Sequence, residues 1–183
     1  SAMLDEVMQA SRVLPTVGHM RRIHDGRPEG VAEQFFTLVR QQVVARDESD
    51  SGFALETACL PLIEGLGDAA ADLAEGLQRL KRPMERLAKA LGAKLDDEAA
   101  ELSTAERGKI EAMSRSLRRR GELMLGGWLS MLHRLNGETN PLMVEWFSVE
   151  QQGQWQVDVG LHSHWLDPTE PLALAVLRPA DGV

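Results

Sequence analysis

Residues 66–95 read LGDAAADLAEGLQRLKRPMERLAKALGAKL, and their large apolar side chains recur at the spacing of an α-helix. The recurring positions are Leu66, Leu73, Leu77, Leu80, Met84, Leu87, Leu91 and Leu95. After one step of seven, every step is three or four residues, which is a heptad-like pattern. The segment therefore predicts one amphipathic helix of about 30 residues, roughly 45 Å long. Gly76 and Pro83 lie inside it, and we expect them to kink or weaken the helix.

A second helix of similar length is predicted after a short link. Ser103 stands three residues before Glu106 in LSTAE, which is the capping-box signature of a helix start. The apolar spacing then continues through Ile110, Met113, Leu117, Met124, Trp128, Met131 and Leu135, and it stops at Asn136-Gly137. A short link between two long helices predicts an antiparallel hairpin over about 66–136. We expect Leu77, Leu80, Met84 and Leu87 of the first arm to face Leu117, Met124, Trp128 and Met131 of the second arm or other core residues.

Shorter elements are predicted before the hairpin, because glycine, proline and polar clusters interrupt the apolar pattern there. The expected elements are one or two short helices over 4–24 with a break at 15–18, a loop over 24–30, a helix from 28 to about 46, a polar loop over 46–52, and a short helix or irregular segment over 53–64. The helix from 28 to 46 rests on apolar residues at helical spacing, among them Phe35, Val39 and Val43.

The C-terminal part changes character, and it predicts two strands. LMVEWFSVE (142–150) and WQVDVGLH (155–162) flank the turn QQGQ, in which Gly153 is suited to a positive φ. A turn over 166–171 and a helix from about 171 to 177 follow. The expected fold class is mainly α: a long antiparallel helical hairpin with shorter helices and a small C-terminal antiparallel β-hairpin. We expect a helical unit over 1–140 and a β-hairpin with a turn and helix over 141–183.

Composition restricts the possible functions. The net charge is −8, from 20 basic and 28 acidic residues, whereas a protein that grips DNA on its own usually carries a basic footprint. No run of about 18 apolar residues is present, so no membrane span is expected. The N-terminus lacks the features of a secretory signal. Cys59 is the single cysteine and has apolar neighbours, which favours a buried, inert thiol and a reducing cytoplasm.

Known catalytic patterns are missing from the sequence. Neither a phosphate-binding glycine loop nor a nucleophile elbow occurs, so no catalytic or cofactor-binding residue is predicted. His162 and His164 share one face if their segment is a strand, but two ligands make a poor zinc site, and two surface or packed histidines are the better interpretation. His19 and His24 fall at helix ends or loops. Asp96, Asp97 and Glu98 fall at the hairpin tip, where a solvated turn is expected.

SRSLRRRGE (114–122) is the one dense basic run, and two interpretations remain open. In the first, it is a solvated helix face, because Glu111 lies four residues before Arg115 and Arg118 lies four before Glu122. In the second, Arg118, Arg119 and Arg120 contact nucleic acid. Arg120 has no acidic residue three or four positions away in the helix, which favours the second interpretation for that residue.

Several stretches resemble the DinG-type helicases, which are relatives of XPD in superfamily 2. VDVGLHSHWLDPTEPLALAVLRPADGV (157–183) resembles the segment just ahead of motif III, and WFSVEQQGQWQVDVGLH (146–162) resembles the paired strands that return the chain to the first motor domain. VLPTVGHMRRIHDGRPEGVAEQFFTLVRQQV (13–43) and SLRRRGELMLGGWLSML (116–132) resemble the helical insertion of a proteobacterial branch. The resemblance covers most of the chain and is strongest in its last part.

The resemblance implies that this chain is much of the arch, the insertion between the DEAH box and motif III of an ATP-dependent 5′–3′ DNA helicase. In that family the arch closes over the motor domain and forms a hole for single-stranded DNA. ATP and Mg²⁺ would then belong to the motor domains of the parent, because neither the Walker A lysine nor the DEAH box is present. The cysteines of the family's iron–sulfur cluster lie elsewhere, and Cys59 matches none of them.

A second hypothesis is a free-standing interaction module, in which the heptad seam of the hairpin pairs with a partner or with itself. The ending favours the first hypothesis, because we do not expect a complete protein to stop at PADGV directly after a strand, turn and helix. In the helicase family, the corresponding segment leads into a strand that ends in Thr-Ser-Ala-Thr-Leu.

Overall fold

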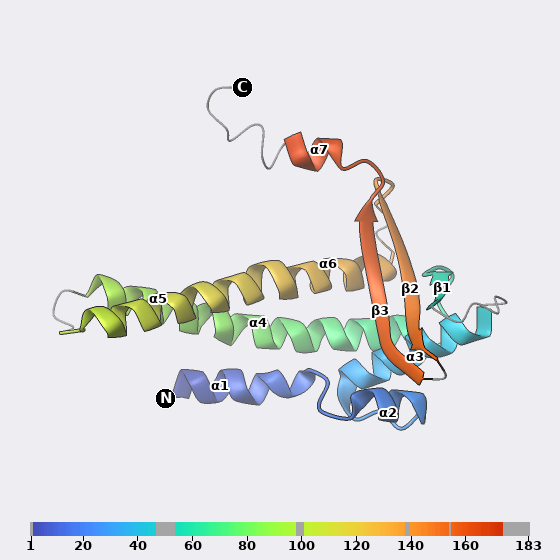
Figure 1. Cartoon of the computed structure of the whole chain (residues 1–183), viewed down its shortest axis with the longest axis horizontal. Helices are drawn as coiled ribbons and strands as arrows, with labels where there is room; N and C mark the ends of the chain where they lie inside the picture. The colour runs from blue at the N-terminus through green and yellow to red at the C-terminus, as the bar shows by residue number, and fades with distance from the viewer. Residues whose placement is uncertain (1, 47–53, 98–100, 138–139, 154, 174–183) are drawn as a thin grey trace.

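The computed structural model of the chain describes residues 2–46, 54–97, 101–137, 140–153 and 155–173. A long helical hairpin runs along the molecule, shorter helices lie beside it, and a small sheet stands at the end opposite the hairpin tip (Figure 1). The mainly α fold with a hairpin and a C-terminal pair of strands is thus confirmed. Of the predicted segments, positions 47–53, Glu98 and 174–183 lie outside the described residues.

The hairpin consists of α4 (Leu66–Asp96) and a composite second arm. That arm is α5 (Thr104–Arg119), the π-helical segment η2 (Arg120–Leu125) and α6 (Gly126–Leu135). The predicted capping box is present: the Ser103 hydroxyl accepts a hydrogen bond from the backbone N–H of Glu106 at 3.3 Å, and the Glu106 carboxylate accepts one from the backbone N–H of Ser103 at 2.9 Å. α4 is one helix through Gly76 and Pro83.

Most of the large apolar residues predicted for the inward face of the second arm lie against the core: Leu135 is buried, and Leu117, Trp128 and Met131 are partly buried and packed on it. Two residues are exceptions. Met113 and Met124 are 55% and 58% exposed, so their expected place in the seam is wrong. The buried positions are Ser114, Gly121, Leu125, Leu129, Leu132 and Leu135. Ser114 donates a hydrogen bond to the backbone oxygen of Ala88 in α4 at 3.1 Å. The predicted pattern omitted Leu125, Leu129 and Leu132, and it could not include Ser114 and Gly121, because small residues there let the two arms approach closely.

Four helical elements described before β1 (Ala54–Ala58) agree well with the sequence. They are α1 (Ala2–Ala10), the 3₁₀ helix η1 (Ser11–Val13), α2 (His19–His24) and α3 (Gly30–Arg46). An ion pair joins the last two of these helices. Arg22 donates through Nε to Oε2 of Glu33 at 2.8 Å and through Nη2 to Oε1 at 2.5 Å, and the Glu33 side chain is only 1% exposed.

The sheet has three antiparallel strands in the order β1-β2-β3. β2 (Met143–Gln152) and β3 (Trp155–Trp165) form the predicted hairpin, with Gly153 at φ 64° in the turn. β1 (Ala54–Ala58) pairs with β2, which corrects the expected helix or irregular segment over 53–64. Five residues are too few to show a clear period, and the partner strand is remote in the sequence. A short helix, α7 (Thr169–Leu172), follows β3.

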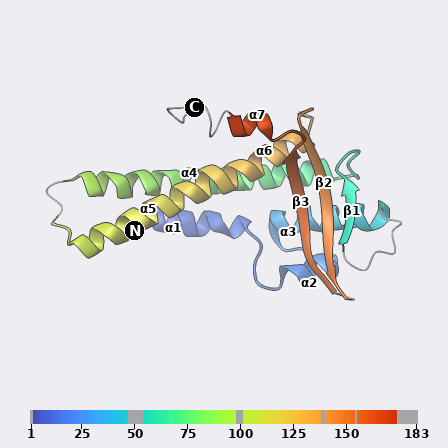
Figure 2. The ribbon, with the colours of Figure 1, turned by 45° about the horizontal axis from the view of Figure 1, so that its top comes forward.

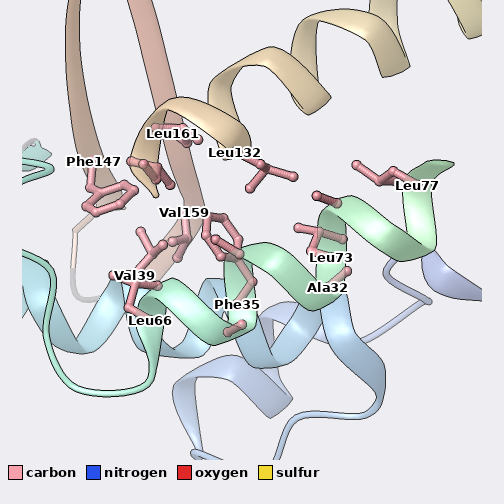
Figure 3. Packing of buried hydrophobic residues seen from close by; sticks show 14 of the residues in the cluster. Ala32, Phe35, Val39, Leu66, Leu73, Leu77, Leu132, Phe147, Val159 and Leu161 are labelled. Carbon is pink, nitrogen blue, oxygen red and sulfur yellow. The ribbon is translucent and has the colours of Figure 1, made fainter. Parts of the chain in front are cut away.

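One face of the sheet packs on the helices and forms the centre of the core. Phe147 and Val149 of β2 are fully buried there, as are Phe35 and Val39 of α3. Figure 3 shows these layers meeting, with Leu132 of α6 above them and Leu66 of α4 below. Sheet, α3 and hairpin therefore share a continuous apolar cluster, so the hairpin base is held while its tip extends away. In the described ranges, no helix is both long enough and apolar enough to cross a membrane.

Candidate functional site

The three arginines singled out in the sequence lie where α5 passes into η2. Arg118, Arg119 and Arg120 are all exposed. None of them forms an ion pair with any residue that the structure describes, although the spacing permits Arg118 to pair with Glu122. One turn earlier, the predicted pair does form: Arg115 donates to Glu111 at 3.0 Å. The solvated-face interpretation therefore holds for Arg115 but does not extend along the whole basic run.

The three side chains do not share one environment. The guanidinium of Arg118 lies over α4, because Nη2 would be 3.1 Å from a Cβ placed on Gly92. Arg119 and Arg120 instead line a groove on another side of the arm. These three arginines thus present charge in two directions, and the groove receives two of them.

This groove is a large apolar hollow of about 830 Å³. Its floor is formed by Leu73, Leu77, Leu80 and Met84 of α4. One wall comes from α1 and the turn after η1, and the other from the α5–η2–α6 arm. Figures 1 and 2 show both walls running beside α4. Because these walls belong to segments far apart in the sequence, the groove cannot be recognised from a local motif.

The electrostatic character of the groove differs from that of the whole chain. Among the described residues that line it, Arg119 and Arg120 are the charged ones, and none is a carboxylate. The chain as a whole carries a net charge of −8. The groove therefore combines an apolar floor with a locally positive rim, which suits a ligand that has an apolar surface and negative charge.

The histidines of β3 belong to a packed cluster on the face of the sheet turned away from the core. The ring of His162 stacks on Trp146, with centroids 4.9 Å apart, and its Nε2 lies 2.7 Å from the hydroxyl oxygen of Ser148. His164 makes a tilted ring contact with the same indole. Gly160 leaves room for this arrangement, because a Cβ there would lie 2.6 Å from Nε2 of His162. These contacts agree with the interpretation of the two histidines as packed residues.

The remaining chemical candidates have structural surroundings. Nδ1 of His19 lies 2.9 Å from the backbone oxygen of Thr16, and Nδ1 of His24 lies 3.4 Å from Asp25. Cys59 is buried, and burial raises the pKa of its thiol to about 12, with a smaller contribution from the charge of Glu145. Over the described part of the chain, no three His, Cys, Asp or Glu side chains gather in a way that suits a metal ion.

The described side chains build a groove that is suited to binding a ligand. They bring together an apolar floor, two walls and two cations, and they hold the only cysteine as an unreactive protonated thiol. Sequence analysis identified Arg119 and Arg120 but missed the groove beside them, including the contributions of Leu14 and Phe36. Comparisons with protein-family models, with curated proteins and with solved structures find no match for this chain.

Proposed function

We propose that this chain is the helical arch insertion of a DinG-type ATP-dependent DNA helicase and that it helps to form the passage for single-stranded DNA. Sequence resemblance over most of the chain supports the proposal. The catalytic groups, ATP and Mg²⁺ belong to the motor domains of the parent, so this segment alone hydrolyses no ATP. A cytoplasmic location follows from the same proposal.

The observation that carries the DNA-binding role is the lack of ion pairs at Arg118, Arg119 and Arg120 within the described structure. An exposed cation that is already paired with a neighbouring carboxylate contributes little to binding a phosphate. These guanidinium groups retain their donors, and guanidinium forms bidentate, charge-assisted hydrogen bonds with phosphate oxygens. Such contacts would hold a DNA backbone without reading its sequence.

The architecture is compatible with an insertion. The hairpin base is held by the sheet and by α3, whereas the hairpin tip lies at the far end of the molecule (Figure 1). The ends of β2 and β3 beside Met143 and Trp165 adjoin the chain segments that lead into and out of the sheet. In the proposed parent, β3 and α7 lead back to the motor domain, and the arms project from it.

The test is a comparison of two triple variants of the parent helicase. Arg118→Ala/Arg119→Ala/Arg120→Ala removes three unpaired cations. The matched control, Arg79→Ala/Lys89→Ala/Arg115→Ala, removes the same charge from the same hairpin. We expect the first variant to bind single-stranded DNA more weakly, to unwind poorly and to show a shallower salt dependence, while its basal ATPase activity is retained. The control is expected to stay close to the parent.

Equal unwinding and equal salt slopes in the two folded variants would refute the proposed role of the three arginines. The coding sequence that follows Val183 provides a separate test of the family assignment. It is expected to continue into the Thr-Ser-Ala-Thr segment, and a Walker A motif is expected upstream.

A second candidate function is a protein-interaction module, which the apolar groove favours. A soluble protein rarely leaves a large apolar hollow uncovered unless the hollow binds something. Because Arg119 and Arg120 line the groove, a partner protein and single-stranded DNA would compete for these two arginines.

A further inference from the structure

We infer that the groove between α1 and the α5–η2–α6 arm binds an amphipathic helix of a partner protein, with acidic residues beside its apolar face. The inference goes beyond the proposed helicase role and does not depend on it. It rests on the shape of the groove, on the side chains that line it, and on the charge at its rim.

The floor of the groove has the spacing of a helix-packing surface. Leu73, Leu77, Leu80 and Met84 follow one another by four, three and four residues along α4. They extend over about 16 Å, or three helical turns. These four side chains are only 3–7% exposed, so they close the bottom of the groove, and a partner helix would contact mainly the exposed side chains of the walls, such as Leu14 and Met124.

The walls leave space for one more element beside α4. α1 packs on one side of α4 and the second arm packs on another, so the groove lies between two helical walls. A helix in this place would complete a four-helix arrangement with α1, α4 and the second arm. The described lining of the groove comes from helices and from the turn after η1 and offers no strand edge, so the observations favour a helical partner over an added strand.

Exposed apolar side chains on both walls indicate that the described residues of this chain leave the groove uncovered. Leu14 is 40% exposed on the first wall, and Met124 is 58% exposed on the second. Methionine adapts its shape easily and is common on surfaces that receive apolar helix faces. Met124 therefore contributes to the groove, which gives a reason for its exposed position outside the hairpin seam.

The positive charge at the rim of the groove predicts negative charge on the partner helix. Arg119 and Arg120 line the groove, no carboxylate lines it, and neither arginine is paired with a described residue. Transferring these groups out of water against a neutral partner would be unfavourable, whereas glutamate or aspartate would satisfy them. The partner helix is therefore expected to carry acidic residues next to its apolar stripe.

The test uses two labelled peptides of about 18 residues with leucine at helical spacing on one face. One peptide carries glutamate on the flanking positions and the other carries lysine. By fluorescence anisotropy with the 183-residue chain, we expect the acidic peptide to bind at least about tenfold more tightly than the basic one. Arg119→Ala/Arg120→Ala is expected to weaken acidic-peptide binding about tenfold, and Arg118→Ala, outside the groove, to leave it unchanged.

A second pair of variants tests the apolar part without changing charge. Leu14→Gln/Met124→Gln alters exposed groove residues and is expected to weaken binding about tenfold. Met113→Gln is the control, because Met113 is similarly exposed, at 55%, but does not line the groove. Circular dichroism establishes that each variant keeps its helical content, so that lost binding reports the groove and not unfolding.

Three outcomes would overturn the inference. They are equal affinity for the two peptides, binding insensitive to Leu14→Gln/Met124→Gln, and a dimer that this variant dissociates, which would place a second copy in the groove.

Single-stranded DNA binding is measured on the same variants. Loss of DNA binding in Arg118→Ala/Arg119→Ala/Arg120→Ala with no peptide preference would reject the groove partner alone. Peptide binding without any arginine-dependent DNA binding would reject the proposed DNA role alone.

Discussion

Val13 packs so closely on Gly76 that α4 has no room for a side chain at that position. A Cβ on Gly76 would lie 2.4 Å from Cγ2 of Val13 and 3.5 Å from its Cβ. Glycine in a helix costs about 1 kcal/mol relative to alanine. The contact explains why this helix nevertheless contains one: glycine allows the segment that connects α1 to α2 to rest directly on α4.

Gly76→Ala is expected to destabilise the protein although alanine favours helix. Val13 is β-branched and has a stiff χ1, so it cannot rotate away without moving the backbone of η1. Overpacking of this kind costs about 1–3 kcal/mol, which exceeds the gain in helix propensity. The measurement is urea unfolding followed by circular dichroism. Gly108→Ala is the control, because nothing lies within 4 Å of a Cβ there, and it should stabilise the chain by up to about 1 kcal/mol. Gly76→Ala should regain stability when combined with Val13→Ala.

The orientation of the second arm is tested by two leucines of the same arm. Leu132 is fully buried and Leu123 is 69% exposed. Leu132→Ala is expected to cost about 2–5 kcal/mol, because it leaves a cavity in the core. Leu123→Ala should stay within about 0.5 kcal/mol of the parent. Chemical denaturation compares them, and equal losses would mean that the arm buries a different face.

Sequence periodicity was sufficient for the elements that are long and amphipathic. The hairpin, its capping box at Ser103 and the strand pair around Gly153 all follow from local patterns that physical chemistry ties to one structure. β1 could not be predicted from the sequence, because a five-residue strand acquires its conformation from pairing with β2. Part of the inward face of the second arm could not be predicted from the sequence either. Ser114 and Gly121 are buried by close helix contact and not by their own apolarity.

The candidate site shows the same division between local and long-range information. Arg119 and Arg120 stand out in the sequence because their density is unusual in an acidic chain. Their relation to Leu14 and Phe36 depends on how α1, α3 and the hairpin pack together. No rule of sequence spacing connects residues that meet only through tertiary structure. The groove could therefore be identified only from the folded structure.

Cys59 is expected to resist thiol reagents in the folded protein. Its side chain is buried, and its pKa is raised to about 12, so the reactive thiolate is scarce near neutral pH. A colorimetric disulfide reagent should therefore react slowly in native buffer and quickly in denaturant. Rapid, complete reaction under native conditions, with the circular dichroism spectrum unchanged, would contradict the buried position of this thiol.

The ion pair between Arg22 and Glu33 is expected to make stability depend on acidic pH. The hydrogen bonds from Arg22 lower the pKa of Glu33 from 4.5 to about 2, although burial acts in the opposite direction. A carboxyl group with a lowered folded-state pKa stabilises the fold above its unfolded pKa and loses that contribution as the pH falls. The contribution should therefore be complete above about pH 5 and disappear progressively toward pH 2. Its size from the shift is roughly 2–3 kcal/mol.

Glu33→Gln tests this dependence when its urea unfolding is compared with that of the parent from neutral pH to about pH 2. The difference in unfolding free energy between parent and variant should be largest at neutral pH and shrink as the carboxylate of the parent becomes protonated. Comparison at each pH cancels the titration of the other acidic groups. Glu29→Gln is the matched control, because Glu29 is 73% exposed and its Oε2 lies 3.6 Å from the same arginine. Its effect should stay within about 0.5 kcal/mol, since exposed pairs contribute little. A Glu33→Gln deficit that is as large at pH 2 as at pH 7 would show that packing or hydrogen bonding, not the charge of Glu33, holds α2 against α3.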